Sequence, residues 1–168
     1  MADGDLTDGG VPTLYDWAGG EAAFRRLIDA FYDRVERDEL LTGFFPGGVT
    51  EEHRAHVTLW WSEVFGGSRV YTDVRGGYAT MLEHHRGLNI TGDERFRFAS
   101  LMSLAADDAQ LPDDPEFRAA LTAYMEWAVG DVLAYSAEGS VVPPGVPMPR
   151  WSWDGLDTTE PLRGAARE

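Results

Sequence analysis

The chain contains no cysteine and no lysine, and no apolar run is as long as a membrane-spanning helix requires. Without cysteine, disulfides, thiolate catalysis, iron–sulfur clusters and cysteine-ligated metals are excluded. All 14 basic residues are arginine against 29 acidic ones, and the net charge of −15 argues against a nucleic-acid partner because phosphates would be repelled. The acidic N-terminus lacks the apolar core of a secretory signal. We therefore expect a cytoplasmic protein that binds neither nucleic acid nor membrane.

The periodicity of the chain is helical, and its 168 residues suit one domain. Thr50, Thr91 and Asp114 are candidate N-caps, and Glu94 completes a capping box with Thr91. Residues 68–75 show no clear period and are expected to be irregular. Amphipathic spacing predicts helices over residues 14–18, 21–35, 39–45, 51–64, 78–85, 91–105 and 115–133. No alternating apolar run is long enough for a sheet, so the predicted fold class is all-α.

Composition divides the chain into three parts. Residues 1–12 are expected to form a disordered acidic arm, residues 13–136 the helical domain, and residues 137–168 a proline-rich extension that carries Trp151 and Trp153. Exposing two tryptophans to water is unfavourable, so we expect this tail to pack on the domain. Binding of the tail to a protein partner is the alternative.

The four histidines occur as two close pairs, each on a helical stripe. His85 falls in register with Met81 and is predicted to face the interior, whereas His84 is rotated by about 100° and is expected to be exposed. His53 and His56 can each reach an interior cavity. Two such helices are suited to face each other across a planar iron cofactor, with one imidazole as the ligand and another opposite.

Other interpretations of the histidines stay open. A histidine on an apolar stripe is often only a buried residue of the core. A metal site without a cofactor is the weaker alternative, because His53 and His56 with Glu52 do not form the zinc motif HExxH, and the Glu-x-x-His pairs of di-iron bundles are missing.

Three sequence runs, taken together, resemble the truncated haemoglobins, most closely those of group II. They are GGEAAFRRLIDAFYDRVERDELLTGFFP, WWSEVFGG and GGYATMLEHHRGLNITGDERFRF. The resemblance extends from about Leu14 to Ser136, and the order and separation of the runs carry it. It implies a shortened globin, in which a two-over-two helical sandwich encloses haem b. It also implies that dioxygen, nitric oxide or another diatomic ligand binds at the iron.

The resemblance further implies roles for individual residues. His85 matches the proximal iron ligand, Tyr32 the distal tyrosine, and His53 the distal position nearest the bound ligand. Haem contacts are expected at Phe31, Phe45, Val57, Trp60, Leu82, Leu88, Phe98 and Met102, and propionate contacts at His56 and Tyr71. Phe98 stands where group II proteins usually carry tryptophan, so the indole donor to the ligand is missing and the distal polarity rests on Tyr32 and His53.

The expected function is the binding of dioxygen together with nitric oxide or peroxide chemistry, as a nitric oxide dioxygenase or a weak peroxidase. A reductase is the expected protein partner. Bulk oxygen transport is less favoured, because a tyrosine donor promotes retention of the ligand. Two alternatives remain: a haem-based redox or gas sensor that acts through a protein bound by the tail, and a helical interaction domain without a cofactor. The sequence leaves the oligomeric state open.

Overall fold

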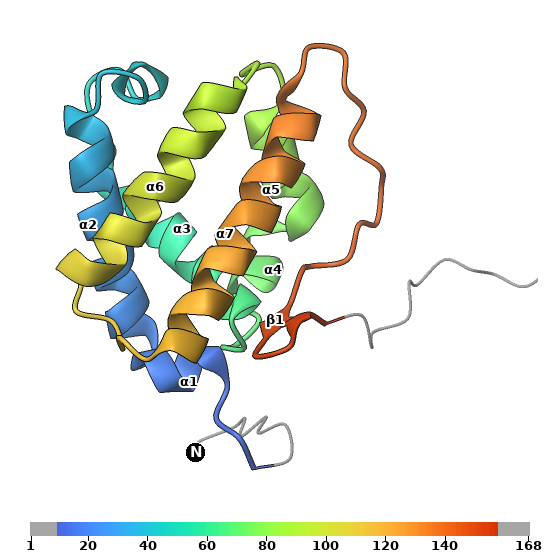
Figure 1. Cartoon of the computed structure of the whole chain (residues 1–168). Coiled ribbons are helices and arrows are strands. Elements are labelled where there is room, and N and C mark those ends of the chain that lie inside the picture. The colour runs from blue at the N-terminus through green and yellow to red at the C-terminus, as the bar shows by residue number, and fades with distance from the viewer. Residues whose placement is uncertain (1–9, 158–168) are drawn as a thin grey trace, which may run out of the picture.

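The computed structural model describes residues 10–157 (Figure 1). Its elements are α1 (Leu14–Ala18), α2 (Glu21–Arg37), the 3₁₀ turn η1 (Thr42–Phe44), α3 (Glu51–Val64), α4 (Val70–Arg75), α5 (Tyr78–His85), α6 (Gly92–Asp108), α7 (Pro115–Ser136), β1 (Trp151–Ser152) and β2 (Gly155–Leu156). The helix predicted over 39–45 is only the short η1. Helix α2 packs against α3 and α6, and α7 packs against α6 and α5. This is the predicted two-over-two arrangement. None of the helices within 10–157 is long and apolar enough to cross a membrane.

The predicted helix starts are confirmed by side-chain caps. The hydroxyl of Thr50 accepts a hydrogen bond from the backbone N–H of His53 at 3.1 Å, and Asp114 caps α7 in the same way. Thr91 and Glu94 form the complete capping box at the start of α6. These caps satisfy backbone donors that the first turn of a helix leaves unpaired. Thr50 thereby fixes the start of α3 directly beside the first histidine pair.

The apolar face of α2 forms the centre of the core, as its spacing predicts. Phe24 is fully buried and stacks between Tyr15 and Phe65, with ring centroids 5.9 and 5.4 Å apart. The buried residues of this helix are Ala23, Phe24, Leu27, Ile28, Phe31, Tyr32 and Val35. Close packing along this face restricts the rotamers of its members. Tyr32 therefore enters the interior from a rigid element.

The expectation of irregular structure over residues 68–75 is wrong, because residues Val70–Arg75 form α4. The carboxylate of Glu63, at 1% exposure, accepts hydrogen bonds from the backbone N–H of Thr72, at 2.8 Å, and from the Thr72 hydroxyl. A buried carboxylate on α3 therefore holds the start of α4. The six-residue segment has too few apolar positions to reveal a helical period, so its conformation depends on this contact from another element.

The tail packs against the helices, as predicted from its tryptophans. Residues 137–157, here called the strap, leave the C-terminal end of α7 and run back along the molecule to the N-terminal half of the same helix. There β1 and β2 form a small hairpin (Figure 1). Trp151 is 8% exposed and lies 5.6 Å from Tyr124 and 5.8 Å from Trp127 between ring centroids. Trp153 contacts the ring of Trp17.

The predicted acidic arm falls mainly on residues 1–9, which lie outside the described residues, as does the end of the tail from residue 158. Pro12, the last residue assigned to the arm, is anchored, because its carbonyl accepts a hydrogen bond from the indole N–H of Trp153 at 2.8 Å. The strap and the chain before α1 therefore meet at one end of the molecule.

Candidate functional site

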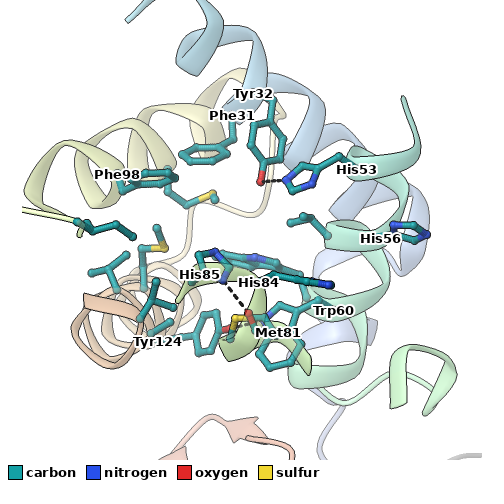
Figure 2. Close-up of a pocket in the computed structure, with 18 of the residues that line it drawn as sticks. Phe31, Tyr32, His53, His56, Trp60, Met81, His84, His85, Phe98 and Tyr124 are labelled. Atoms are coloured by element: carbon teal, nitrogen blue, oxygen red, sulfur yellow. Dashed lines mark hydrogen bonds between the residues drawn. The ribbon is translucent and has the colours of Figure 1, made fainter. Parts of the chain in front are cut away.

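His85 is the last residue of α5 and lines a mainly apolar cavity between the helices. Its Nδ1 lies 2.8 Å from the backbone carbonyl of Met81 (Figure 2). A carbonyl only accepts hydrogen bonds, so Nδ1 must carry the proton. In the neutral ring Nε2 then keeps a lone pair, and no described residue hydrogen-bonds it. This is the arrangement that orients a histidine for metal ligation through Nε2.

Burial also favours the neutral form of this imidazole. Loss of hydration lowers the pKa of His85, an effect that the hydrogen bond to Met81 partly opposes and the neighbouring His84 reinforces. A neutral ring is the form that donates a lone pair to a metal. The prediction that His85 faces the interior agrees with the structure, in which its side chain lines the cavity. The side chain of His84 is exposed, as expected, yet it also lines the rim of the same cavity.

Tyr32 and His53 lie together on the opposite side of the cavity from Met81 (Figure 2). The hydroxyl of Tyr32 and Nε2 of His53 share a hydrogen bond of 3.0 Å, and Tyr32 is 5% exposed. Burial raises the pKa of Tyr32 well above its ordinary value, although the charge of Arg54 opposes the shift. Burial lowers the pKa of His53, and the other histidines add to this effect. The pair is therefore neutral near pH 7 and offers hydrogen-bond donors without a net charge.

Aromatic side chains enclose this polar pair. The ring of Phe31 contacts Tyr32 and Phe98, with centroids 5.0 and 5.5 Å away. Phe45 packs against Tyr32 and His53 from behind, at 5.5 and 5.3 Å. These contacts restrict the orientation of both polar side chains and exclude water from one side of them.

The cavity holds about 1080 Å³ of space between its atoms, a volume that includes open solvent at its mouth. It brings together most of the residues predicted to contact a cofactor: Phe31, Tyr32, His53, His56, Val57, Trp60, Tyr71, His85, Phe98 and Met102. Phe45, Leu82 and Leu88 are not among its lining residues. Leu82 is fully buried in the core, and Leu88 is 43% exposed because the chain turns outward after α5.

Further lining residues were not predicted as site residues. They are Trp61, Arg75, Met81, His84, Ile90, Arg95, Tyr124, Met125, Ala128, Val129 and Val132. The five from α7 follow a helical period, so the same stripe that predicted the helix was a signal for this wall. No signal pointed to Arg75, because α4 was not expected. The hydroxyl of Tyr124 accepts a hydrogen bond from the indole N–H of Trp60 at 2.8 Å, which joins α3 to α7 below His85.

The chemistry of the lining limits what the cavity can hold. Within residues 10–157, no group of three or more His, Asp or Glu side chains is placed to hold a bare metal ion. A metal that arrives within its own ring system needs only one protein ligand, and His85 is available for that role. The walls are mainly apolar, with two arginines, Arg75 and Arg95. These features suit a flat, largely apolar molecule that carries a metal and anionic groups.

Comparison with known proteins agrees with this geometry. Residues 13–130 match the family model for bacterial-like globins. Among curated proteins, the group 1 truncated hemoglobin of Nostoc sp. is 32% identical over 80 residues, which span 48% of this chain and 64% of that protein. The group 2 truncated hemoglobin of Bacillus subtilis is 30% identical over 92 residues, 55% of this chain and 68% of that one.

Solved structures give the same result. The hemoglobin of Chloroflexus aurantiacus is 34% identical, with a TM-score of 0.65, and the match covers 73% of this chain and 98% of that chain. The group II truncated hemoglobin of Bacillus anthracis has a TM-score of 0.66 at 22% identity, over 77% of this chain and 98% of that chain, and this similarity concerns the fold alone.

Proposed function

The chain belongs to the bacterial-like globin family, and on this premise we propose that it binds haem b in the cavity and takes dioxygen or another diatomic ligand beside Tyr32 and His53. The observation that carries the proposal is the orientation of His85. Its Nδ1 is tied to the Met81 carbonyl, and Nε2 is left without a protein partner at the cavity.

The residues present fit a haem group. The neutral imidazole of His85 supplies the axial nitrogen, and Phe31, Val57, Phe98 and Met102 supply apolar surface from three different helices. Burying apolar surface contributes about 25 cal/mol per Å². Haem, once bound, supplies an iron with one coordination position left for a small ligand.

The residues of this chain determine what that small ligand meets. Tyr32 and His53 provide the polar groups, and their hydrogen bond holds a donor at a fixed position before any ligand arrives. Phe98 contributes no donor, because its ring carries no N–H or O–H group. It packs against Phe31. A polarised diatomic ligand is therefore stabilised through the phenol of Tyr32, with His53 either as its partner or as a second donor.

A buried tyrosine donor favours slow release of the ligand. We therefore assign the protein to oxygen binding with nitric oxide or peroxide chemistry rather than to bulk transport, with a reductase as the expected electron source. In the sensor alternative, the acidic body and the tail bind a protein partner. Within residues 10–157, Trp151 and Trp153 both pack against other side chains of the same chain, which supports the first function over the sensor.

The test uses the adjacent histidines as a matched pair. His85→Gly and His84→Gly remove the same side chain from neighbouring positions, and only His85 has the orientation that ligation requires. We expect a Soret band in the wild type and in His84→Gly. In His85→Gly we expect weak, altered haem absorption that is restored by added imidazole. A colourless wild type after addition of hemin, or an unchanged spectrum in His85→Gly, would refute the proposal.

A further inference from the structure

Tryptophan and tyrosine rings form a series that starts at the wall of the cavity and enters the strap. Trp60 and Tyr124 both line the cavity, and the indole N–H of Trp60 donates a hydrogen bond to the Tyr124 hydroxyl at 2.8 Å (Figure 2). The ring of Tyr124 also lies 5.6 Å from that of Trp151, measured between centroids. The strap, which follows the part of the chain that matches the globin family, thus touches the cavity wall through one ring.

The strap continues the series to an exposed indole. Trp153 follows Trp151 by two residues, which separates their Cα atoms by at most about 7 Å. The ring of Trp153 lies 5.6 Å from that of Trp17. Trp17 is 46% exposed, whereas Trp151 is 8% exposed. Trp17 and Trp153, here called the surface tryptophan pair, therefore connect the buried rings to solvent.

Every ring in this series is one that can lose an electron. A core position also accepts leucine or phenylalanine of suitable volume, yet each member from the cavity to the surface is tryptophan or tyrosine, whose rings are the most readily oxidised among aromatic side chains. Phe65 lies beside the series at Tyr124. Phe117 lies beside it at Trp153. Neither phenylalanine interrupts the series, so its composition suits the transfer of electrons.

A carboxylate favours the loss of an electron from Trp17. The indole N–H of Trp17 donates a hydrogen bond to Asp114 at 2.8 Å. The backbone N–H of Phe117, and then this indole, lower the pKa of Asp114, so the carboxylate is charged at neutral pH. Its negative charge stabilises the positive charge that remains when an electron leaves the indole. Trp153 instead donates to the uncharged carbonyl of Pro12, so Trp17 is the favoured end of the series.

We propose that the surface tryptophan pair is a second oxidation site, where phenols too large for the cavity give up electrons to hydrogen peroxide that is reduced within it. The inference rests on the proposed function and adds a substrate class to its peroxide chemistry. An exposed indole face binds an aromatic donor by stacking.

The electrons and protons of this reaction balance. Reduction of one hydrogen peroxide to two waters takes two electrons and two protons. Two phenols each supply one electron and one proton and leave as phenoxyl radicals. The protons are exchanged with water, and the electrons pass inward along the rings of Trp17, Trp153, Trp151, Tyr124 and Trp60.

The first test locates the oxidised residues. Hemin-loaded protein is treated with hydrogen peroxide without a donor, and its peptides are mapped by mass spectrometry. We expect oxidation at the surface tryptophan pair in the wild type and the loss of most of it in Trp151→Phe, which keeps a ring but interrupts the series. Trp127→Phe is the matched control, because Trp127 also touches Trp151, at 5.8 Å, and its removal leaves the contact with Tyr124 in place. It should retain the oxidation.

Three outcomes of this test would overturn the proposal. Equal oxidation of the pair in the wild type and in Trp151→Phe, or in wild-type protein without hemin, would mean that peroxide attacks exposed rings directly. An equal loss in Trp151→Phe and Trp127→Phe would mean that loosened packing is the cause. A wild type that shows no Soret band is a failure of the proposed function, whereas a haem-bound protein that is oxidised elsewhere refutes this inference alone.

The second test compares one phenol at two sizes. Free tyramine can enter the mouth of the cavity, and tyramine coupled to dextran cannot. Oxidation of each is followed by the fluorescence of dityramine. In Trp17→Phe we expect oxidation of the conjugate to fall relative to that of free tyramine, and an unchanged ratio would overturn the proposal. Because Trp17 lies at the surface, this variant carries the test should Trp151→Phe fail to fold.

Discussion

Replacing Tyr32 with phenylalanine removes the single hydroxyl that we assign to the ligand, and it leaves the surrounding packing nearly unchanged. In the structure this hydroxyl shares a 3.0 Å hydrogen bond with Nε2 of His53. A ligand must therefore take over, or share, a bond that already exists. Only the difference between the two hydrogen bonds contributes to ligand retention.

The magnitude follows from that exchange. A neutral hydrogen bond contributes about 1 kcal/mol, and one to a partly charged acceptor contributes about 1.5–3 kcal/mol. The difference is about 0.5–2 kcal/mol, and about 1.4 kcal/mol, within this range, corresponds to a factor of ten. We therefore expect dioxygen to dissociate about tenfold faster from Tyr32→Phe than from the wild type. A hundredfold effect would require the hydroxyl to be free before the ligand binds.

Stopped-flow replacement of dioxygen by carbon monoxide measures this rate. Tyr124→Phe is the control, because it removes a buried hydroxyl that also lines the cavity but is bonded to Trp60 on the side away from Tyr32. Unchanged dissociation in Tyr32→Phe, or equal acceleration in both variants, would refute the role of Tyr32. A further acceleration in the double variant with His53→Leu would indicate that His53 replaces the lost donor.

Two other predictions concern stability. Because burial lowers the pKa of His53, the unfolded chain binds more protons than the native apoprotein below about pH 6.5. The free energy of unfolding in urea should therefore decrease as the pH falls through that value, and less steeply in His53→Leu; an equal slope would contradict this. Arg54 is 8% exposed and pairs with three carboxylates. We therefore expect Arg54→Met to lower the free energy of unfolding, measured in the same assay, by about 2 kcal/mol. Arg25→Met should cost less than about 1 kcal/mol, because Glu51, one of the two carboxylates that Arg25 pairs with, is largely exposed.

The parts of the site that the sequence predicted are those that depend on register within one helix. His85 was separated from His84 by its spacing from Met81, and the structure adds that the same Met81 accepts the hydrogen bond that orients the ring. The position of Tyr32 followed from the apolar face of α2, which is buried as its period requires. Such features are local, so a single sequence suffices to predict them.

The parts that were missed depend on contacts between distant elements. Helix α4 is stabilised by Glu63 from α3, and without that contact its short sequence shows no preference for a helix. Arg75 was overlooked for this reason. The packing of the strap was expected from the presence of Trp151, but its partners on α7, Tyr124 and Trp127, were not identifiable from composition.

The orientation of the His85 imidazole depends both on a contact within its own helix and on contacts between distant elements. Its ring plane is set locally by Met81, whereas the turn that follows α5 is held at the end of α7. The backbone N–H groups of Gly87 and Asn89 both donate to the carbonyl of Ser136, at 2.9 and 3.0 Å, and Ser136 is 1% exposed. Helix α5 therefore ends against the residue from which the strap departs. The strap also contacts α7 through β2. We therefore expect a change that weakens the packing of α7 to alter the position of His85, through Ser136, more than the position of Tyr32.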